Sequence, residues 1–186
     1  CLANNHNVMC VDAPVSGGVT GAETAALTFM VGGSLDAFNC TKPILQSMGQ
    51  KIIHTGDAGS GQVAKICNNM LLGISMIASS EAFNLGKALG LNPQKLHEVV
   101  TNSSGQCWVM DKYVPEPDIL KSVPANNNYK PGFSIAMMLK DLNMSQQSAQ
   151  TAEVTTQLGN LAQRIYQRAF DDKLGELDFS AIIRVC

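Results

Sequence analysis

The chain has 186 residues, of which 45% are apolar and only 15% are charged, and its net charge is −2. This composition supplies a packed core and excludes a disordered chain, and the balanced charge excludes a basic surface for nucleic acid or an anionic membrane. Soluble domains usually carry about 25% charged residues, so we expect another domain or subunit to cover part of the surface.

The first residues indicate that the sequence begins inside a domain. Cys1 is not an initiator methionine, and residues 1–5 are typical of a helix end, so we expect a fragment that lacks the start of a domain. The six cysteines have no regular spacing, which favours a reducing compartment over a disulfide framework. No metal site is predicted, because the histidines lack partners at ligand spacing.

Strands and helices alternate over about the first 55 residues. Three strands are predicted, over 8–12, 27–31 and 51–54. A glycine-rich segment and a short helix follow the first strand, and Ser34 is suited to cap a helix over 35–48. Three strands in so short a segment predict the end of an α/β sheet.

The remainder of the chain is predicted to be all helical. Apolar residues at spacings of three and four predict a long helix over 61–89 that is apolar nearly all round and therefore buried on most sides. Asn92 and Pro93 are typical of a helix start, and proline and asparagine make 112–132 an irregular loop. Further helices are predicted over 93–101, 134–150 and about 154–169, and in a short tail capped by Asp178. The domains are expected to be 1–58 and 59–186.

Residues 59–64 match the G-x-G-x-x-A pattern of dinucleotide-binding loops. Such a loop belongs to a βαβ unit with a parallel strand after the helix, whereas only helices are predicted here. We expect these glycines to let the chain leave the sheet and start a close-packed helix instead.

Lys65 is the most informative single residue, because it shares a helix face with Asn69, Leu72 and Met76. Such a lysine either extends to solvent or is held in a partly dry site, where it can transfer protons. Asn69 favours the second interpretation, because its amide can hold a substrate oxygen or the lysine itself.

Three other positions have both a functional and a structural interpretation. Ser16, Gly17 and Gly18 follow a strand, so their N–H groups and hydroxyl can bind an anion, although a plain turn is the alternative. The pair Lys140–Asp141 is by itself typical of a solvated ion pair, and Trp108 is expected in the core.

Taken together, these segments resemble the β-hydroxyacid dehydrogenase family. Residues 12–22 are similar to its substrate-binding signature, and residues 59–69 are similar to its catalytic-lysine motif. Residues 103–108, 124–127 and 140–142 are most similar to the members that oxidise 3-hydroxyisobutyrate to methylmalonate semialdehyde in mitochondrial valine breakdown. The resemblance covers nearly the whole chain in order.

The resemblance implies the end of an NAD-binding Rossmann domain joined by a long helix to an all-α domain. It implies that Lys65 takes the hydroxyl proton of a small hydroxy acid as hydride passes to NAD, and that Asn69 orients that hydroxyl. The other implied site residues are Ser16, Gly17 and Gly18 for the substrate carboxylate and Lys140 and Phe133 for the cofactor. A fragment without the first Rossmann strands is expected to be inactive alone.

Several alternatives stay open. A 6-phosphogluconate dehydrogenase typically has a histidine where this chain has Asn68, together with basic residues for the phosphate, whereas glyoxylate and semialdehyde reductases differ mainly in the lining of the pocket. A non-catalytic helical interaction module would not need Lys65, Asn69, the Ser16–Gly18 turn and Lys140 together. We expect a homodimer or homotetramer built through the helical region, located in the mitochondrial matrix.

Overall fold

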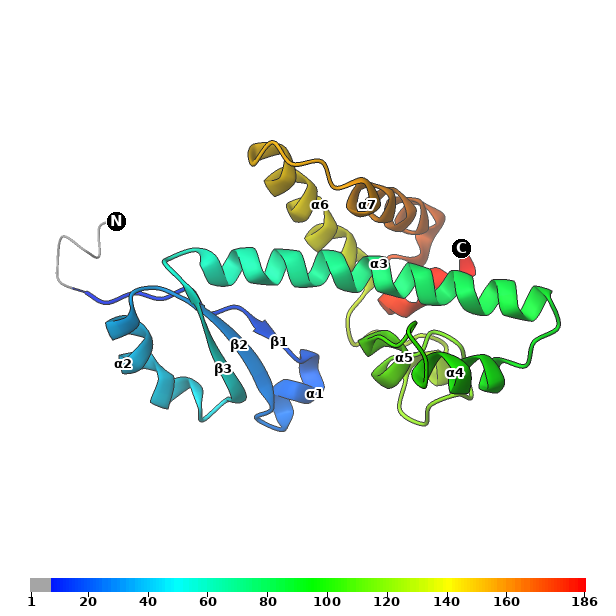
Figure 1. The fold of residues 1–186 in the computed structure, drawn as a ribbon, viewed down its shortest axis with the longest axis horizontal. Coiled ribbons are helices and arrows are strands. Elements are labelled where there is room, and N and C mark those ends of the chain that lie inside the picture. Colours follow the sequence, from blue (N-terminus) through cyan, green and yellow to red (C-terminus); the bar gives the residue numbers. More distant parts are fainter. Residues whose placement is uncertain (1–7) are drawn as a thin grey trace. The chain divides into compact units, whose positions relative to one another are not determined.

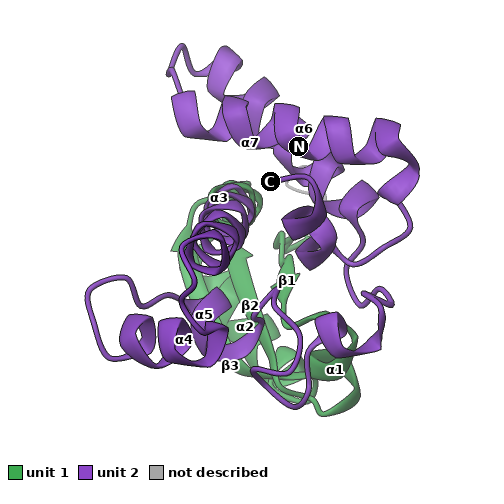
Figure 2. Cartoon of the chain, turned by 90° about the vertical axis from the view of Figure 1, so that its right-hand side faces the viewer, with its two compact units in different colours: residues 1–68 green, residues 69–186 purple. Residues whose placement is uncertain are grey.

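The computed structural model describes residues 8–186, and Figure 1 labels its helices and strands. The chain divides into two compact units, residues 1–68 and residues 69–186, which Figure 2 colours separately. The division falls inside the long helix α3 (Ser60–Ala88), so its first turns belong to the first unit. An α/β segment followed by helices confirms the predicted fold class. The helix end predicted over 1–5 lies outside the described residues.

The first unit contains a three-stranded sheet in the order β1-β2-β3. Its strands are β1 (Val15–Ser16), β2 (Leu27–Gly32) and β3 (Gly49–Gly56). β2 and β3 pair in parallel and confirm the two predicted strands, while β1 pairs antiparallel to β2. The strand predicted over 8–12 is wrong: Val8 and Met9 are exposed, and that segment makes only an isolated bridge between Asp12 and Gly32. An extended apolar run forms a strand only where a neighbouring backbone pairs with it.

Two helices complete the first unit, α1 (Gly18–Glu23) and α2 (Leu35–Leu45). The Ser34 hydroxyl accepts a hydrogen bond from the Ala37 N–H at 3.2 Å, which confirms the predicted cap, although α2 ends earlier than predicted. The core of this unit combines side chains of β2 and α2, namely Leu27, Phe29, Val31, Phe38 and Leu45.

The second unit is all helical, as predicted. After the greater part of α3 it contains α4 (Pro93–Thr101), α5 (Trp108–Lys112), α6 (Ile135–Thr151) and α7 (Gln157–Ala169), with shorter helical turns η2 (Pro124–Asn127), η3 (Phe170–Leu174) and η4 (Phe179–Arg184). Its larger core is built on side chains of α3, α6, α7 and the tail, among them Met76, Phe83, Met138, Tyr166 and Phe179. α5 was not predicted.

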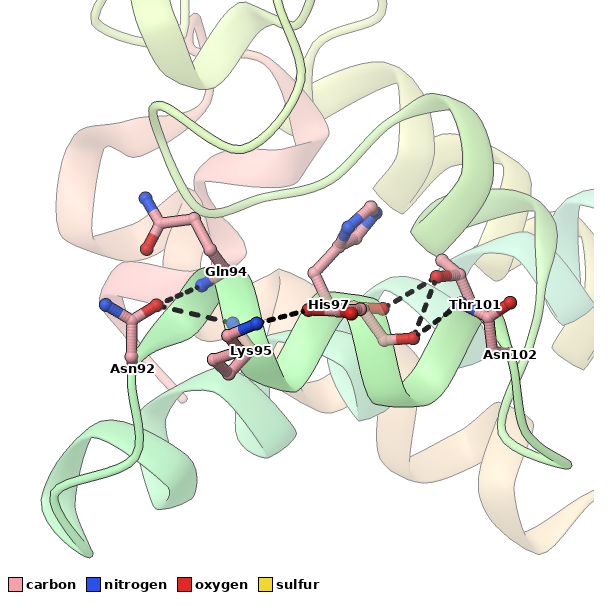
Figure 3. Close-up of polar contacts among 7 residues, drawn as sticks. Asn92, Gln94, Lys95, His97, Thr101 and Asn102 are labelled. Atoms are coloured by element: carbon pink, nitrogen blue, oxygen red, sulfur yellow. Dashed lines mark hydrogen bonds and ion pairs between the residues drawn. The ribbon is translucent and has the colours of Figure 1, made fainter.

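Polar caps fix where these helices begin. The Asn92 side chain accepts hydrogen bonds from the N–H groups of Gln94 and Lys95 at 2.9 and 3.3 Å (Figure 3), which confirms the start predicted from Asn92 and Pro93. At α6, the Ser134 hydroxyl accepts from the Met137 N–H at 3.2 Å. Each cap satisfies donors that the first helical turn leaves without intrahelical partners.

The second-unit part of α3 leaves one face exposed. Leu71 and Leu85 on that face are 64% and 62% exposed, whereas Met76 and Phe83 are fully buried and most of the other residues are at least partly buried, as the sequence predicts. Apolar periodicity indicates which faces are suited to burial, but the remaining helices of the unit cover only part of α3. Among the described residues, no helix is long and apolar enough to cross a membrane.

Candidate active site

In the first unit, a carboxylate joins the two segments that carry the predicted motifs. Asp12 accepts hydrogen bonds from the backbone N–H groups of Gly59 and Gln62, at 2.6 and 3.0 Å. A negative charge at the start of α3 satisfies donors of the first turn and interacts favourably with the helix dipole. Asp12 therefore holds the segment that leads to Ser16 against the segment that leads to Lys65.

Two glycines make this contact possible. A Cβ on Gly61 would collide with the Met30 carbonyl oxygen and would lie 2.7 Å from the Asp12 carboxylate. A Cβ on Gly32 would lie 2.5 Å from the same carboxylate. The start of α3 thus packs directly on β2, and its amides already bind Asp12 rather than presenting an empty anion site. Gly61 thus serves the predicted close-packed helix start, whereas Gly59, with a φ of +93°, serves the turn that leads into it.

The predicted carboxylate-binding turn lies at the end of β1. Ser16 is the last residue of the strand and pairs with Thr28, and Gly17 and Gly18 then turn the chain into α1. Their φ values of +136° and +62° lie in the region that favours glycine, and both residues are exposed. The turn therefore presents backbone and a hydroxyl without side-chain bulk, which is the property that anion binding requires.

Lys65 lies in the second turn of α3 and is half-buried. Asn69 follows one turn later, and the spacing of four residues places the two side chains on the same face of the helix. Residues up to 68 belong to the first unit, so Lys65 shares that unit with Ser16, Gly17 and Gly18.

In the second unit, α3 and α6 are joined by a buried polar contact. The Asn69 Nδ2 donates a hydrogen bond to Oδ2 of Asp141 at 2.6 Å, and Lys140 Nζ lies 3.1 Å from Oδ1 of the same carboxylate. The side chain of Asp141 is 9% exposed and that of Lys140 is 65% exposed. The prediction of a solvated ion pair is therefore wrong for Asp141, which is buried, and correct for Lys140, whose ammonium extends toward water.

Close helix packing brings these groups together. A Cβ on Gly73, one turn beyond Asn69, would lie 3.2 to 3.4 Å from side-chain atoms of Met138 and Leu142 on α6. Glycine at this point lets the two helices approach, and Asp141 lies between those two contact residues in the sequence. The signal that could have identified Asp141 is its spacing of three and four from buried Met138 and Ser145.

Phe133 lies directly before the Ser134 cap of α6 and is partly exposed. Its ring meets Phe179 edge-on, with centroids 5.6 Å apart. Trp108 was expected in the core, and this is wrong: it is 53% exposed and stacks on Tyr113 with centroids 5.4 Å apart.

Residues 59–186 match the model described as the NAD-binding domain of NADP-dependent 3-hydroxyisobutyrate dehydrogenase. Residues 2–56 match the model described as the NAD-binding domain of 6-phosphogluconate dehydrogenase. The two matches meet near the predicted change from an α/β segment to helices.

Individual relatives extend the same similarity. The chain is 48% identical over 172 residues to the mitochondrial 3-hydroxyisobutyrate dehydrogenase of Drosophila melanogaster and 46% identical over 174 residues to that of Homo sapiens. These alignments cover 92% and 94% of this chain but only 53% and 52% of the relatives. A solved structure of Mycobacterium tuberculosis 3-hydroxyisobutyrate dehydrogenase with L-serine matches with a TM-score of 0.93 at 46% identity, over 98% of this chain and 62% of that one. The chain thus spans little more than half the length of the relatives it matches.

Proposed function

This chain belongs to the 3-hydroxyisobutyrate dehydrogenase family, and we propose that it serves an NAD-dependent enzyme that oxidises the hydroxyl group of a short 3-hydroxy acid. The observation that carries the proposal is the buried Asp141 carboxylate, which bonds Asn69 of the lysine motif and pairs with Lys140. A helical interaction module has no need for a buried carboxylate between these two residues, because an apolar contact between helices would be at least as stable.

The reaction requires a group that takes a proton while the carbon loses a hydride. NAD, when bound, accepts that hydride. Lys65, as the neutral amine, takes the hydroxyl proton, so that the C–O bond becomes a carbonyl, and returns it in the reverse direction. Asn69 orients the hydroxyl, and Asp141 restricts the orientation of the Asn69 amide through the 2.6 Å hydrogen bond.

The substrate carboxylate is assigned to Ser16, Gly17 and Gly18. Their exposed turn offers N–H groups and a hydroxyl, and its glycines allow an anion to approach the backbone closely. A bound carboxylate fixes one end of a short 3-hydroxy acid and leaves the 3-hydroxyl at the other end within reach of Lys65. Binding through two ends of a short substrate favours small hydroxy acids over phosphorylated sugars, for which the sequence offers no cluster of basic residues.

Phe133, just before α6, and Lys140, in the second turn of α6, are chemically suited to the cofactor. Phe133 offers a partly exposed aromatic ring. Lys140 offers an exposed ammonium that pairs with Asp141 and still faces solvent. A planar nicotinamide and an anionic dinucleotide are compatible with this combination of ring and cation. These two residues are assigned to the cofactor, and α3 supplies the proton-transfer lysine.

A substrate panel tests this function with the full-length enzyme. NADH absorbance is followed with 3-hydroxyisobutyrate, L-serine, glycerate, 4-hydroxybutyrate and 6-phosphogluconate, and with glyoxylate in the reducing direction. We expect the highest kcat/KM for 3-hydroxyisobutyrate, in line with the names of the relatives. A preference for glyoxylate would favour a related reductase, and no turnover with any substrate would favour a non-catalytic module.

The proposed enzyme is a homodimer or homotetramer that associates through its helical region. Large apolar side chains on two helices of the second unit support this assignment, because Leu71 and Leu85 on α3 and Leu158 on α7 are all more than 60% exposed. Analytical ultracentrifugation of the full-length enzyme should give a dimer or tetramer, whereas a stable monomer at micromolar concentration would contradict it. The mitochondrial matrix is the proposed location, supported by the names of the fly and human relatives and testable by cell fractionation.

A further inference from the structure

A second buried carboxylate, Asp178, lies outside the residues assigned to the reaction. It is fully buried, directly before the tail helix η4, and none of the ion pairs found within residues 8–186 includes it. A buried carboxylate without a cation needs several hydrogen-bond donors to compensate for lost hydration. Asp178 has five of them.

The five donors come from three separate segments of the second unit. Oδ1 accepts from the N–H and the hydroxyl of Ser180, at 3.0 and 2.6 Å, within the tail itself. Oδ2 accepts from the Tyr113 hydroxyl at 2.9 Å and from the N–H groups of Gly132 and Phe133 at 3.2 and 3.3 Å. Oδ1 thus caps the tail, while Oδ2 joins the end of α5 to the residues that precede α6.

The same donors hold a row of aromatic rings in place. Trp108 stacks on Tyr113, Tyr113 lies 5.2 Å from Phe179 between centroids, and Phe179 meets Phe133. The Phe133 backbone is held from both sides, because its N–H donates to Asp178 and its carbonyl accepts from the Phe179 N–H at 2.8 Å. The position of the Phe133 ring therefore depends on the Asp178 carboxylate.

We propose that Asp178 is a positioning residue that sets the affinity for the nicotinamide cofactor by fixing Phe133 through Oδ2. The inference rests on the proposed function, because that function assigns Phe133 to the cofactor. The two oxygens of this carboxylate thus have different roles. Oδ1 stabilises the tail, whereas Oδ2 fixes the positions of the cofactor-facing Phe133 ring and of the stacked Tyr113 and Trp108 rings.

Asp178→Asn tests the proposal in the full-length enzyme. An amide accepts with one end only and is neutral, so even when its oxygen faces the three donors on the Oδ2 side, it holds them more weakly than a carboxylate does. We expect the KM for NAD to rise about tenfold, while kcat and the KM for the hydroxy acid change less than about threefold. A purely structural residue would instead lower the stability and the active fraction, leaving the KM for NAD unchanged.

Ser180→Ala is the matched control, because it removes a donor from Oδ1 and leaves all three donors of Oδ2. It should lower the thermal stability and leave the KM for NAD unchanged. Tyr113→Phe removes one donor from Oδ2 but keeps the ring, so it should raise the KM for NAD about threefold. This variant decides the matter if Asp178→Asn does not fold: a KM for NAD equal to that of Ser180→Ala would overturn the proposal.

Fluorescence quenching of Trp108 by acrylamide gives a readout that does not depend on activity. The Trp108 signal is the difference between each protein and its Trp108→Phe counterpart. Asp178→Asn should increase the quenching of this signal, since it loosens Tyr113, whereas Ser180→Ala should not. Equal quenching in both would overturn the positioning role. If the wild-type enzyme oxidises none of the hydroxy acids, the proposed function fails, and the quenching comparison still tests Asp178.

Discussion

Replacing Asp141 by asparagine probes the contact that links the lysine motif to α6. The substitution keeps the size of the side chain and removes its charge. The wild-type carboxylate accepts from Asn69 at 2.6 Å and faces the Lys140 ammonium at 3.1 Å, and it is almost completely buried. Asparagine can still accept from Asn69, but only as a neutral group, so the orientation of the Asn69 amide becomes less restricted.

The size of the effect follows from the two contacts. Hydrogen bonds to charged groups contribute about 1.5–3 kcal/mol and neutral ones about 0.5–1.5, so the Asn69 contact weakens by roughly 1–1.5 kcal/mol. The ion pair adds at most about 1 kcal/mol, because Lys140 is largely exposed. A neutral side chain is also easier to bury, which offsets part of this loss. We expect a net loss of about 1 kcal/mol in the free energy of unfolding.

The assay compares stability with turnover of the full-length enzyme. Because Asn69 orients the substrate hydroxyl, kcat/KM for the hydroxy acid should fall on the order of tenfold. Asp172→Asn is the matched control, since it removes a carboxylate from an exposed pair with Arg168, and it should change the stability by less than about 0.5 kcal/mol and leave kcat/KM unchanged. If Asp141→Asn behaved like this control, the role given to the buried carboxylate would be refuted.

Two further predictions concern the packing and the titration of single residues. Gly61→Ala should destabilise the first unit by about 1–3 kcal/mol, because the added Cβ meets the Met30 carbonyl. An unchanged melting temperature in calorimetry would contradict the close packing described at the start of α3. Burial, together with the Asp178 carboxylate, holds the pKa of Tyr113 well above its usual range, so the neutral phenol is favoured in the folded state. The stabilisation by Tyr113 is therefore complete below about pH 10 and declines as the pH rises further. In denaturant unfolding between pH 8 and 10.5, the free energy of unfolding should fall more for wild type than for Tyr113→Phe.

Local signals predicted much of the fold. The caps at Ser34 and Asn92 and the apolar repeat of α3 each depend on neighbouring residues only, and each was confirmed. The strand predicted over 8–12 failed because strand formation depends on a distant partner, and β2 pairs there with Val15 and Ser16 instead.

The environment of the candidate site was harder to predict than its residue types. Asp141 is adjacent to a charged residue in the sequence, which suggested solvent, yet its position between Met138 and Leu142 buries it against α3. Asp178 was expected only as a helix cap, and its contacts with Tyr113 and Phe133 join segments more than 40 residues away. Such contacts depend on tertiary packing, which local sequence patterns do not report.

The most direct test of the proposed chemistry is the turnover of Lys65→Ala in the full-length enzyme. As the proton-transfer group, Lys65 should account for a factor on the order of 10² or more in kcat, while the affinity for NAD stays nearly unchanged. Lys65→Arg should not restore activity, because a guanidinium does not release its proton near pH 7. Lys140→Ala should raise the KM more than it lowers kcat. A near-normal kcat for Lys65→Ala, with kcat abolished in Lys140→Ala, would contradict the assignment of proton transfer to Lys65.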